Sequence, residues 1–232
     1  LFRSMTNDSM YEILMNLPAF RGITYNKVSQ IVEKAKFHFL RFSPGSIIVD
    51  EGEECTYVKF IIKGAAKISI IDKAKRFSVE QTLTAPSMIS PDFLFGRITR
   101  YPGRVVAQGP EDCGVVQISK NDYMQLLAGD EILILNMLNM LSMNSQQSLR
   151  GALAISTGSL ERRIASWIIA LTQNDATDIV IHAGQDDFYR IFSTDKEIFD
   201  KTIESMTRRG LIDSEPFTLR IKSRRELRDM LS

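Results

Sequence analysis

The pattern of apolar and polar positions changes character three times along the chain. Residues 8–36 place apolar side chains at helical spacing, and residues 37–119 break into short apolar runs separated by turn residues. Helical spacing returns over residues 120–153, and the remainder alternates helical and strand-like segments. Because a period of 3.6 residues predicts helices and short bounded runs predict strands, the chain is expected to be α+β.

The second segment has many short strands with glycine-bearing turns at nearly even spacing, which is typical of a sandwich or small barrel. We therefore expect an antiparallel β-roll of the jelly-roll or cupin-like type. The expected strands are Phe37–Phe42, Ile47–Val49, Tyr57–Ile62, Ala66–Ile71, Arg76–Leu83, Arg104–Gln108 and Val115–Ile118.

Residues 120–153 predict a helix capped at Asn121 or Asp122, followed by a long helix with two apolar stripes. Such a helix is either enclosed by its own domain, or covers the β-roll and pairs with a second subunit. We favour pairing, because a small β domain has little bulk to enclose a long helix. The first stripe holds Leu133, Met137, Met140 and Asn144, and the second holds Ile134, Leu138, Leu141, Ser145 and Ser148.

The last segment begins at a small polar hinge, Ser156–Ser159, which also caps an amphipathic helix running to Leu171. A short strand, Thr177–His182, precedes a second helix, and Ser193-Thr194-Asp195 gives a turn and cap signal for a third. A final strand is expected at Phe217–Ile221. Two helices joined by a short turn and followed by short strands predict a winged helix-turn-helix. The buried face of the third helix is expected to hold Ile198, Phe199, Ile203 and Met206.

The outer face of that third helix is charged, which fits either a base-reading helix or an ordinary solvated surface. Lysine can donate to guanine or phosphate and glutamate can accept from cytosine, but Asp200 and Glu204 would repel phosphate unless turned away. Basic residues gather at the helix end, the wing and the tail, where phosphate contacts are expected. They are Arg208, Arg209, Arg220, Lys222, Arg224, Arg225 and Arg228.

Composition adds little to this picture. The 232 residues are 44% hydrophobic and 25% charged, as in globular proteins, and the net charge of +1 gives no indication of a nucleic-acid or membrane partner. No apolar run is long enough to span a membrane, so we expect no membrane partner. The chain begins Leu1-Phe2-Arg3, with neither a signal-peptide core nor a starting Met, and we expect a few residues to precede it. Cys55 and Cys113 are expected to be reduced and buried, in a cytoplasmic protein.

The residue types also argue against several kinds of chemistry. Two cysteines are too few for an iron–sulfur cluster, and His38 and His182 are too few for a haem or cupin metal centre. No nucleophile, glycine-rich phosphate loop or paired carboxylates stand out. We therefore expect no catalytic residues, no metal and no cofactor, and a metal-dependent cupin enzyme is disfavoured.

The order and spacing of several motifs resemble the Crp/Fnr family of bacterial transcription regulators over nearly the whole chain. Phe42–Ile48 with Asp50–Glu53 resembles the opening of the family's β-roll, and Ile61–Gly64 its next turn. Thr194–Lys201 and Gly210-Leu211-Ile212 stand where the recognition helix and its exit lie. The resemblance implies a homodimer that binds double-stranded DNA, with RNA polymerase as a further partner. It places base-reading residues at Lys196, Glu197 and Lys201; Arg208, Arg220 and Lys222 complete the predicted DNA contacts.

The effector segment departs from the family pattern. Members that bind cyclic AMP carry a Gly-Glu pair and an Arg-Ser pair, where this chain has Ser90-Pro91 and Gly103-Arg104. Proline supplies neither a carboxylate nor a backbone N–H, and a shift of one residue turns a strand side chain to the other face. We therefore expect an effector other than cyclic AMP, or none. The candidate pocket residues are Ser90, Arg104, Val105 and Ser148, the last standing where the family's dimer helix offers a hydroxyl.

The sequence thus predicts three parts: an effector-type β-roll with N-terminal helices over residues 1–119, a dimerisation helix over 120–155, and a winged helix-turn-helix domain over 156–232. The predicted function is sequence-specific, homodimeric transcription regulation. The alternative is a small-molecule-sensing dimer whose DNA-binding domain has degenerated, since the domain's acidic residues outnumber its basic ones.

Overall fold

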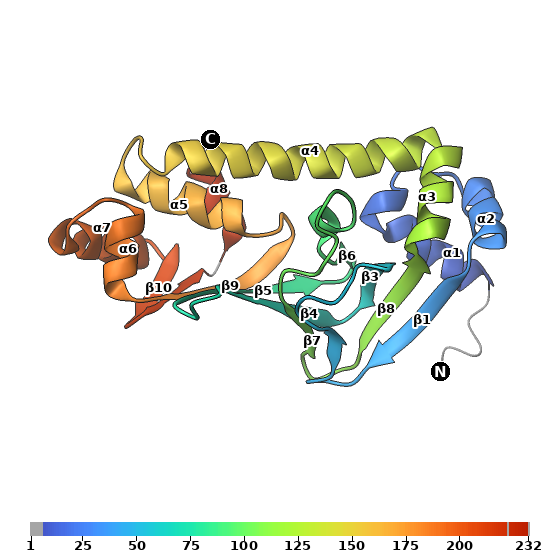
Figure 1. Cartoon of the computed structure of the whole chain (residues 1–232), viewed down its shortest axis with the longest axis horizontal. Coiled ribbons are helices and arrows are strands. Elements are labelled where there is room, and N and C mark those ends of the chain that lie inside the picture. Colours follow the sequence, from blue (N-terminus) through green and yellow to red (C-terminus); the bar gives the residue numbers. More distant parts are fainter. Residues whose placement is uncertain (1–6, 222, 232) are drawn as a thin grey trace. The chain divides into compact units, whose positions relative to one another are not determined.

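The computed structural model describes residues 7–221 and 223–231 and has the expected α+β character (Figure 1). It comprises two compact units. The N-terminal unit holds the residues up to Lys67 together with Leu83–Ser142, and the C-terminal unit holds Ile68–Thr82 together with the residues from Met143 onward.

The N-terminal unit opens with helices and continues as an antiparallel β-roll. Its helices are α1 (Asn7–Asn16), the short 3-10 helix η2 (Pro18–Phe20) and α2 (Tyr25–Lys34). The predicted strands all form, and those at Phe37–Phe42, Ile47–Val49 and Arg104–Gln108 have the bounds expected from the sequence. The strands are β1 (Phe37–Phe42), β2 (Ile47–Val49), β3 (Tyr57–Lys63), β4 (Ala65–Ile71), β5 (Phe77–Thr84), β6 (Ser87–Met88), β7 (Arg104–Gln108) and β8 (Cys113–Ser119). Most residues of β4 and β5 lie in Ile68–Thr82 and so belong to the C-terminal unit.

Strand β8 lies between β1 and β3 in a four-stranded sheet of order β1-β8-β3-β6, and all of its pairings are antiparallel. Val116 pairs with Phe39 on one side and with Phe60 on the other. Strands β4, β7 and β2 are neighbours in a second sheet. Gly64 makes the tight turn between β3 and β4, because its φ of +73° suits glycine and a Cβ atom there would lie 3.1 Å from the Asp112 carbonyl oxygen.

The roll encloses an aromatic and aliphatic core. Phe60 lies between Phe20 and Tyr123, with ring centroids 6.4 Å from each. Both predicted thiols, Cys55 and Cys113, are buried and free, as expected. Burial raises the pKa of the Cys113 thiol to about 11, because an apolar environment disfavours the thiolate.

Helix α3 (Lys120–Gly129) follows β8, and α4 (Glu131–Ala154) follows α3. The expected cap at Asn121 or Asp122 is wrong by two or three residues, because Ser119 accepts the Asp122 backbone N–H at 3.0 Å and so begins the helix. Within the described residues, no helix alone has the length and apolar character to cross a bilayer; α3 and α4 would meet that test only together, and they are bent by 114°.

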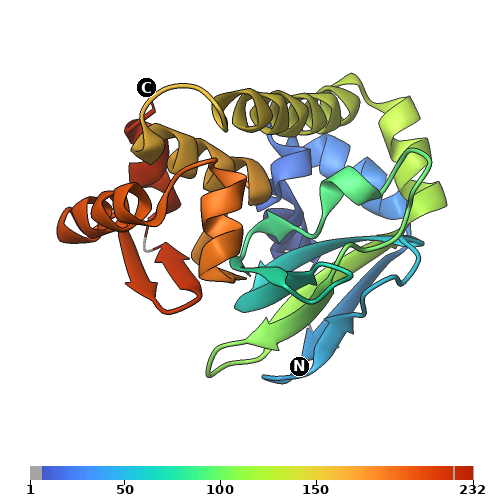
Figure 2. The same ribbon diagram turned by 60° about the vertical axis from the view of Figure 1, so that its left-hand side comes forward.

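The C-terminal unit contains two helices joined by a short turn and followed by a β-hairpin (Figure 2). Helix α7 packs beside β10, and the strands β10, β11, β9, β5 and β4 follow one another in a sheet. The elements are α5 (Leu160–Leu171), β9 (Ala176–Ala183), α6 (Gln185–Ile191), α7 (Lys196–Arg208), β10 (Ile212–Glu215), β11 (Thr218–Ile221) and α8 (Arg224–Asp229).

Candidate functional site

Helix α7 is held by one apolar side and presents a charged side to solvent. Phe199 stacks on Phe188 and Phe192 with ring centroids 5.7 and 6.2 Å away, and Ile203 and Met206 are buried with it. These three burials confirm the predicted inner face. Ile198 is a correction, since its side chain is 53% exposed. At 100° per residue it lies well away from the direction of Phe199 and Ile203, so the predicted stripe was drawn too wide.

Both ends of α7 are fixed. Asp195 caps the helix by accepting the Ile198 backbone N–H at 2.9 Å, as the sequence predicted. On the side of α5, Glu161 accepts hydrogen bonds from Ser205 at 3.0 Å and from Arg209 at 2.7 Å. Arg209 is therefore engaged within the protein. These contacts set the orientation of α7 within the C-terminal unit.

The side of α7 opposite Phe199 carries a single line of exposed charges. Glu197, Lys201, Glu204 and Arg208 recur at intervals of four, three and four residues, so they share one face. Their signs alternate along the helix. Lys201 Nζ lies 2.6 Å from Glu197 Oε1, with both side chains largely exposed. Lys196 is also exposed, at the first turn.

Two DNA contacts were predicted in and just after the β10–β11 hairpin, at Arg220 and Lys222, and the structure describes the first of them. Arg220 on β11 is exposed and its Nη1 lies 3.1 Å from Asp178 Oδ1. Lys222 is the predicted residue that the structure does not describe. The turn between β10 and β11 places Phe217 in the left-handed region, at φ +66°, with its ring exposed.

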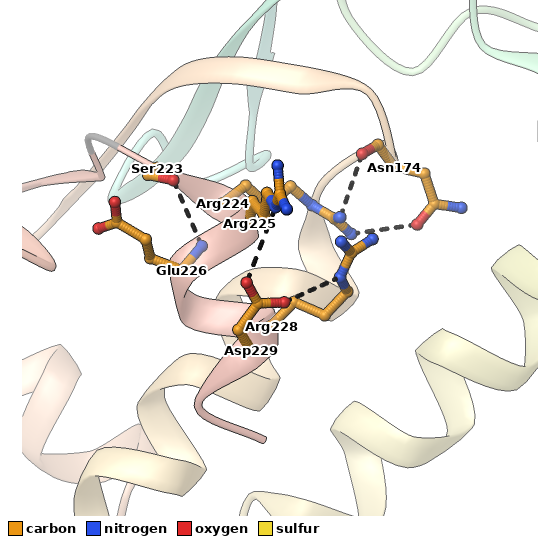
Figure 3. A network of polar contacts seen from close by, with 7 residues as sticks. All are labelled: Asn174, Ser223, Arg224, Arg225, Glu226, Arg228 and Asp229. Atoms are coloured by element: carbon orange, nitrogen blue, oxygen red, sulfur yellow. Dashed lines mark hydrogen bonds and ion pairs between the residues drawn. The ribbon is translucent and has the colours of Figure 1, made fainter. Parts of the chain in front are cut away.

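Arg224 is a second correction: the sequence grouped it with phosphate-contacting residues, but it is 5% exposed. Its Nε donates to Thr172 Oγ1 at 3.0 Å, and one guanidinium nitrogen donates to the Ile169 carbonyl oxygen. The guanidinium group also donates to Asn174 (Figure 3). Burial, followed by repulsion from Arg228, lowers the pKa of Arg224 to about 10. Arg224 therefore joins α8 to the end of α5.

The predicted effector residues differ in burial, and one of them lies outside the β-roll. Ser90 is buried and adopts φ +46° immediately before the short helix η3 (Pro91–Phe93). Arg104 is exposed and its Nε lies 2.9 Å from Asp50 Oδ1, whereas the next residue, Val105, is fully buried. Arg104 and Val105 thus face opposite sides of β7. Ser148 lies on α4 in the C-terminal unit and is exposed.

Sequence reasoning missed a buried cation in the same roll. Lys59 on β3 is 5% exposed, with its Nζ 3.7 Å from Glu53 and 5.6 and 5.5 Å from the ring centroids of Tyr57 and Tyr101. Burial lowers the pKa of Lys59, and the nearby Glu53 opposes that shift. Strict alternation along β3 would expose Lys59, but four consecutive residues from Val58 are buried, because both faces of the strand are covered.

Metal-binding chemistry has no counterpart in the part of the chain that the structure describes. No group of three or more His, Cys, Asp and Glu side chains there is placed to hold a metal ion. His38 packs edge-on against Tyr57, with ring centroids 6.2 Å apart, and His182 Nδ1 lies 3.0 Å from Thr218 Oγ1. Both histidines thus have structural neighbours of their own.

The comparisons with known proteins concern mainly the antiparallel β-roll and the helix α3 that follows it. Residues 39–130 match the family of the cyclic nucleotide-binding domain. The sensor domain of the transcriptional regulator DNR from Pseudomonas aeruginosa is similar in structure, with a TM-score of 0.51 and 15% identity over 61% of this chain and 92% of that one. Residues 39–130 are therefore similar to cyclic nucleotide-binding domains, and the resemblance of the chain to Crp/Fnr-type regulators is confirmed for the fold.

Two further solved structures show lower structural similarity over more of the chain. The catabolite activator protein of Thermus thermophilus has a TM-score of 0.45 and 13% identity, covering 92% of this chain and 98% of that one. The c-di-GMP responsive regulator CLP of Xanthomonas campestris has a TM-score of 0.48 and 16% identity, covering 84% and 99%. No curated protein matches the sequence.

Proposed function

We propose that the protein is a homodimeric, sequence-specific DNA-binding transcription regulator of Crp/Fnr type, and no enzyme. The observation that carries the proposal is the line of exposed charges on α7, held outward by Phe199 and followed by the β10–β11 hairpin. A helix fixed by its apolar side with donors and acceptors on the other can enter a major groove. Lys196, Glu197 and Lys201 are the proposed base-reading residues, in a winged helix-turn-helix domain over residues 156–232.

The proposed dimer rests on the second apolar stripe of α4. Ile134 and Leu138 are 41% and 53% exposed in the single chain, whereas Leu133 and Met137 of the first stripe are buried. The exposed stripe has alternating spacings of four and three residues, which is the pattern of a two-stranded coiled coil. Two copies joined along the α4 helices, within the proposed part 120–155, would present two α7 helices to half-sites about 34 Å apart.

The proposed effector, if the roll takes one, is not cyclic AMP. In the segment after β6, Pro91 is buried and has no N–H to donate, and Asp92 is exposed. Arg104 is held outside by Asp50. Arg104 and Val105 face opposite sides of β7, which argues against a shared site for a cyclic phosphate. A regulator of this kind would act in the cytoplasm with RNA polymerase.

A second candidate is a sensing dimer whose DNA-binding domain has degenerated. It is favoured by the alternation of acidic and basic residues on α7 and by the pairing of Lys201 with Glu197. Such a surface has no net positive charge with which to attract phosphates.

One experiment separates the two functions. The whole chain is used to select duplexes from a random library, and fluorescence anisotropy then measures binding at increasing salt. A regulator should enrich a two-fold symmetric site, and log affinity should fall linearly with log salt, at about 0.9 per phosphate contacted. Failure to enrich any site, with the protein folded and dimeric, would favour the degenerate sensor.

A further inference from the structure

A cavity of about 680 Å³ lies wholly within the C-terminal unit, between the second half of α4, helix α5, and α8 with the segment after it. Its size is in the range of sites for small organic ligands. It is distinct from the exposed face of α7 and from the segment that follows β6. Its lining includes Gln147, Arg150, Arg162, Asn174, Arg228 and Leu231.

The lining is strongly cationic. Arg150, Arg162 and Arg228 contribute three guanidinium groups, and none of the described lining residues is acidic. Arg150 forms no ion pair with a residue that the structure describes. The Arg162 side chain donates to a neutral group, the Leu231 carbonyl oxygen, at 3.0 Å. Arg228 Nε lies 3.9 Å from Asp229 Oδ1, at the limit of an ion pair and in an exposed position.

Two further groups add positive charge near the cavity: the side chain of Arg224 and the N-terminal end of α5. Arg228 lies close enough to the buried Arg224 to depress its pKa, and Figure 3 shows both side chains beside Asn174. Gly158, at the cavity wall, directly precedes the Ser159 cap of α5, so the positive end of that helix faces the same region. Asp175 and Asp229 offset part of this repulsion, and a bound anion would relieve more of it.

Hydrogen bonds within the protein hold the cavity walls in place without a ligand. Gln147 Nε2 donates to the carbonyl oxygens of Ile169 and Thr172, and Asn174 Nδ2 donates to Asn144 Oδ1 at 3.0 Å. These contacts join α4 to the end of α5. A ligand would therefore enter a site that needs little reorganisation.

The cavity and the proposed dimer seam use different sides of α4. Met143, Gln147, Arg150 and Ala154 recur at intervals of three and four residues and so share a side. The seam positions Leu141, Ser145 and Ser148 fall on the opposite side by helical geometry. A dimer formed through the seam leaves the cavity open.

We propose that this cavity binds a phosphate-bearing organic anion of nucleotide size. Guanidinium groups bind phosphate oxygens in pairs, and three of them match a diphosphate better than a single carboxylate. Met143, Ala154 and Ile169 add apolar lining for the organic part. The volume exceeds what inorganic phosphate alone would fill. The bound anion would hold α4 and α5 together at the hinge Ser156–Ser159.

Calorimetry of the whole chain with ADP, GDP, adenosine and inorganic phosphate tests the proposal. We expect one ADP or GDP per chain, no heat with adenosine, and phosphate at least tenfold weaker than the diphosphates. Arg150→Gln and Arg162→Gln should each weaken diphosphate binding at least tenfold. Arg190→Gln, an exposed arginine of α6 outside the cavity, should leave it unchanged.

Two results would overturn the proposal: absence of binding by both diphosphates, or binding that survives both cavity substitutions, which would place the nucleotide elsewhere. Thermal melts establish that each variant is folded. Arg150→Gln is the decisive variant, because Arg150 supports no described contact whose loss could unfold the unit. The result is independent of DNA binding, so the regulator proposal stands or falls separately.

Discussion

Gly151 of α4 and Ala170 of α5 are in direct backbone-level contact. A Cβ atom added at Gly151 would lie 2.1 Å from the Ala170 Cβ and 3.0 Å from the Ser166 carbonyl oxygen. Real Cβ atoms do not approach so closely, so only glycine at this position permits the two helices to pack as they do. The same stretch of α4 carries Gln147, whose amide reaches the end of α5. The close packing of α4 on α5 therefore depends on glycine at position 151.

Gly151→Ala is expected to loosen that state. Alanine is favoured over glycine in a helix by roughly 1 kcal/mol, but overpacking typically costs about 1–3 kcal/mol, and the clash is with a helix rather than a flexible chain end. Urea unfolding should show a lower midpoint. Gly129→Ala in α3 is the matched control, because nothing lies within 4 Å of its added Cβ; it should be neutral or stabilising. Equal stability of both variants would contradict the packing argument.

Periodicity in the sequence was enough to predict the helices and strands and most of the buried face of α7. Strand β1, bounded by a turn at Ser43-Pro44-Gly45, and the Asp195 cap are encoded locally, and both were predicted. The burial of Arg224 was not predicted. Its partners Ile169, Thr172 and Asn174 are some fifty residues away in the sequence, and no residue near Arg224 indicates them. The close approach of Gly151 and Ala170 depends on tertiary packing in the same way.

Arg224→Met is expected to destabilise the protein by about 3 kcal/mol, because it removes the hydrogen bonds that a buried charged group donates to Ile169, Thr172 and Asn174. Arg225→Met is the control: its side chain is 83% exposed, and such changes usually stay within about 0.5 kcal/mol. Urea unfolding measures both. If Arg224→Met unfolds at the same urea concentration as Arg225→Met, the buried network contributes nothing to stability.

Leu138→Glu is expected to convert the dimer to a monomer of 26.3 kDa. The substitution places a charge in the apolar seam, and burying it against a second copy would cost several kcal/mol. Asn139→Glu, one position along and exposed on another side of α4, should remain dimeric. Light scattering coupled to size exclusion reports the mass. If the wild-type chain is itself monomeric at micromolar concentration, the proposed dimer interface along α4 is wrong.

Cys113 should make the protein sensitive to alkali. Its pKa rises from 9.0 to about 11 on folding, so the folded state keeps a proton that the unfolded state loses. The contribution to stability is therefore complete below pH 9 and is lost as the pH rises toward 11, by roughly 1.4 kcal/mol per pH unit. Cys113→Ala removes this dependence. The stability difference between wild type and Cys113→Ala should narrow by about 1 kcal/mol between pH 8.5 and pH 10 in urea unfolding; a constant difference would show that the thiol titrates alike in both states.

The pairing of Lys201 with Glu197 gives the sharpest test of the base-reading role. At a distance of 2.6 Å the lysine is engaged in the free protein, so binding to guanine must exchange this contact for one with the base. Lys201→Ala should then weaken the selected site by about 1–3 kcal/mol while leaving unselected duplexes almost unaffected. Glu197→Gln should strengthen binding to unselected DNA, because it removes a negative charge that would face the phosphates and releases Lys201 from its ion pair.

Lys73→Ala, an exposed lysine in the turn between β4 and β5, is the control for loss of one positive charge. Anisotropy titrations at fixed salt compare the three variants on selected and unselected duplexes. A uniform loss on both duplexes with Lys201→Ala would make Lys201 a phosphate contact instead of a base-reading residue. If both α7 variants bind every duplex as the wild type does, the outer face of α7 does not touch DNA, and the charged line is an ordinary solvated surface.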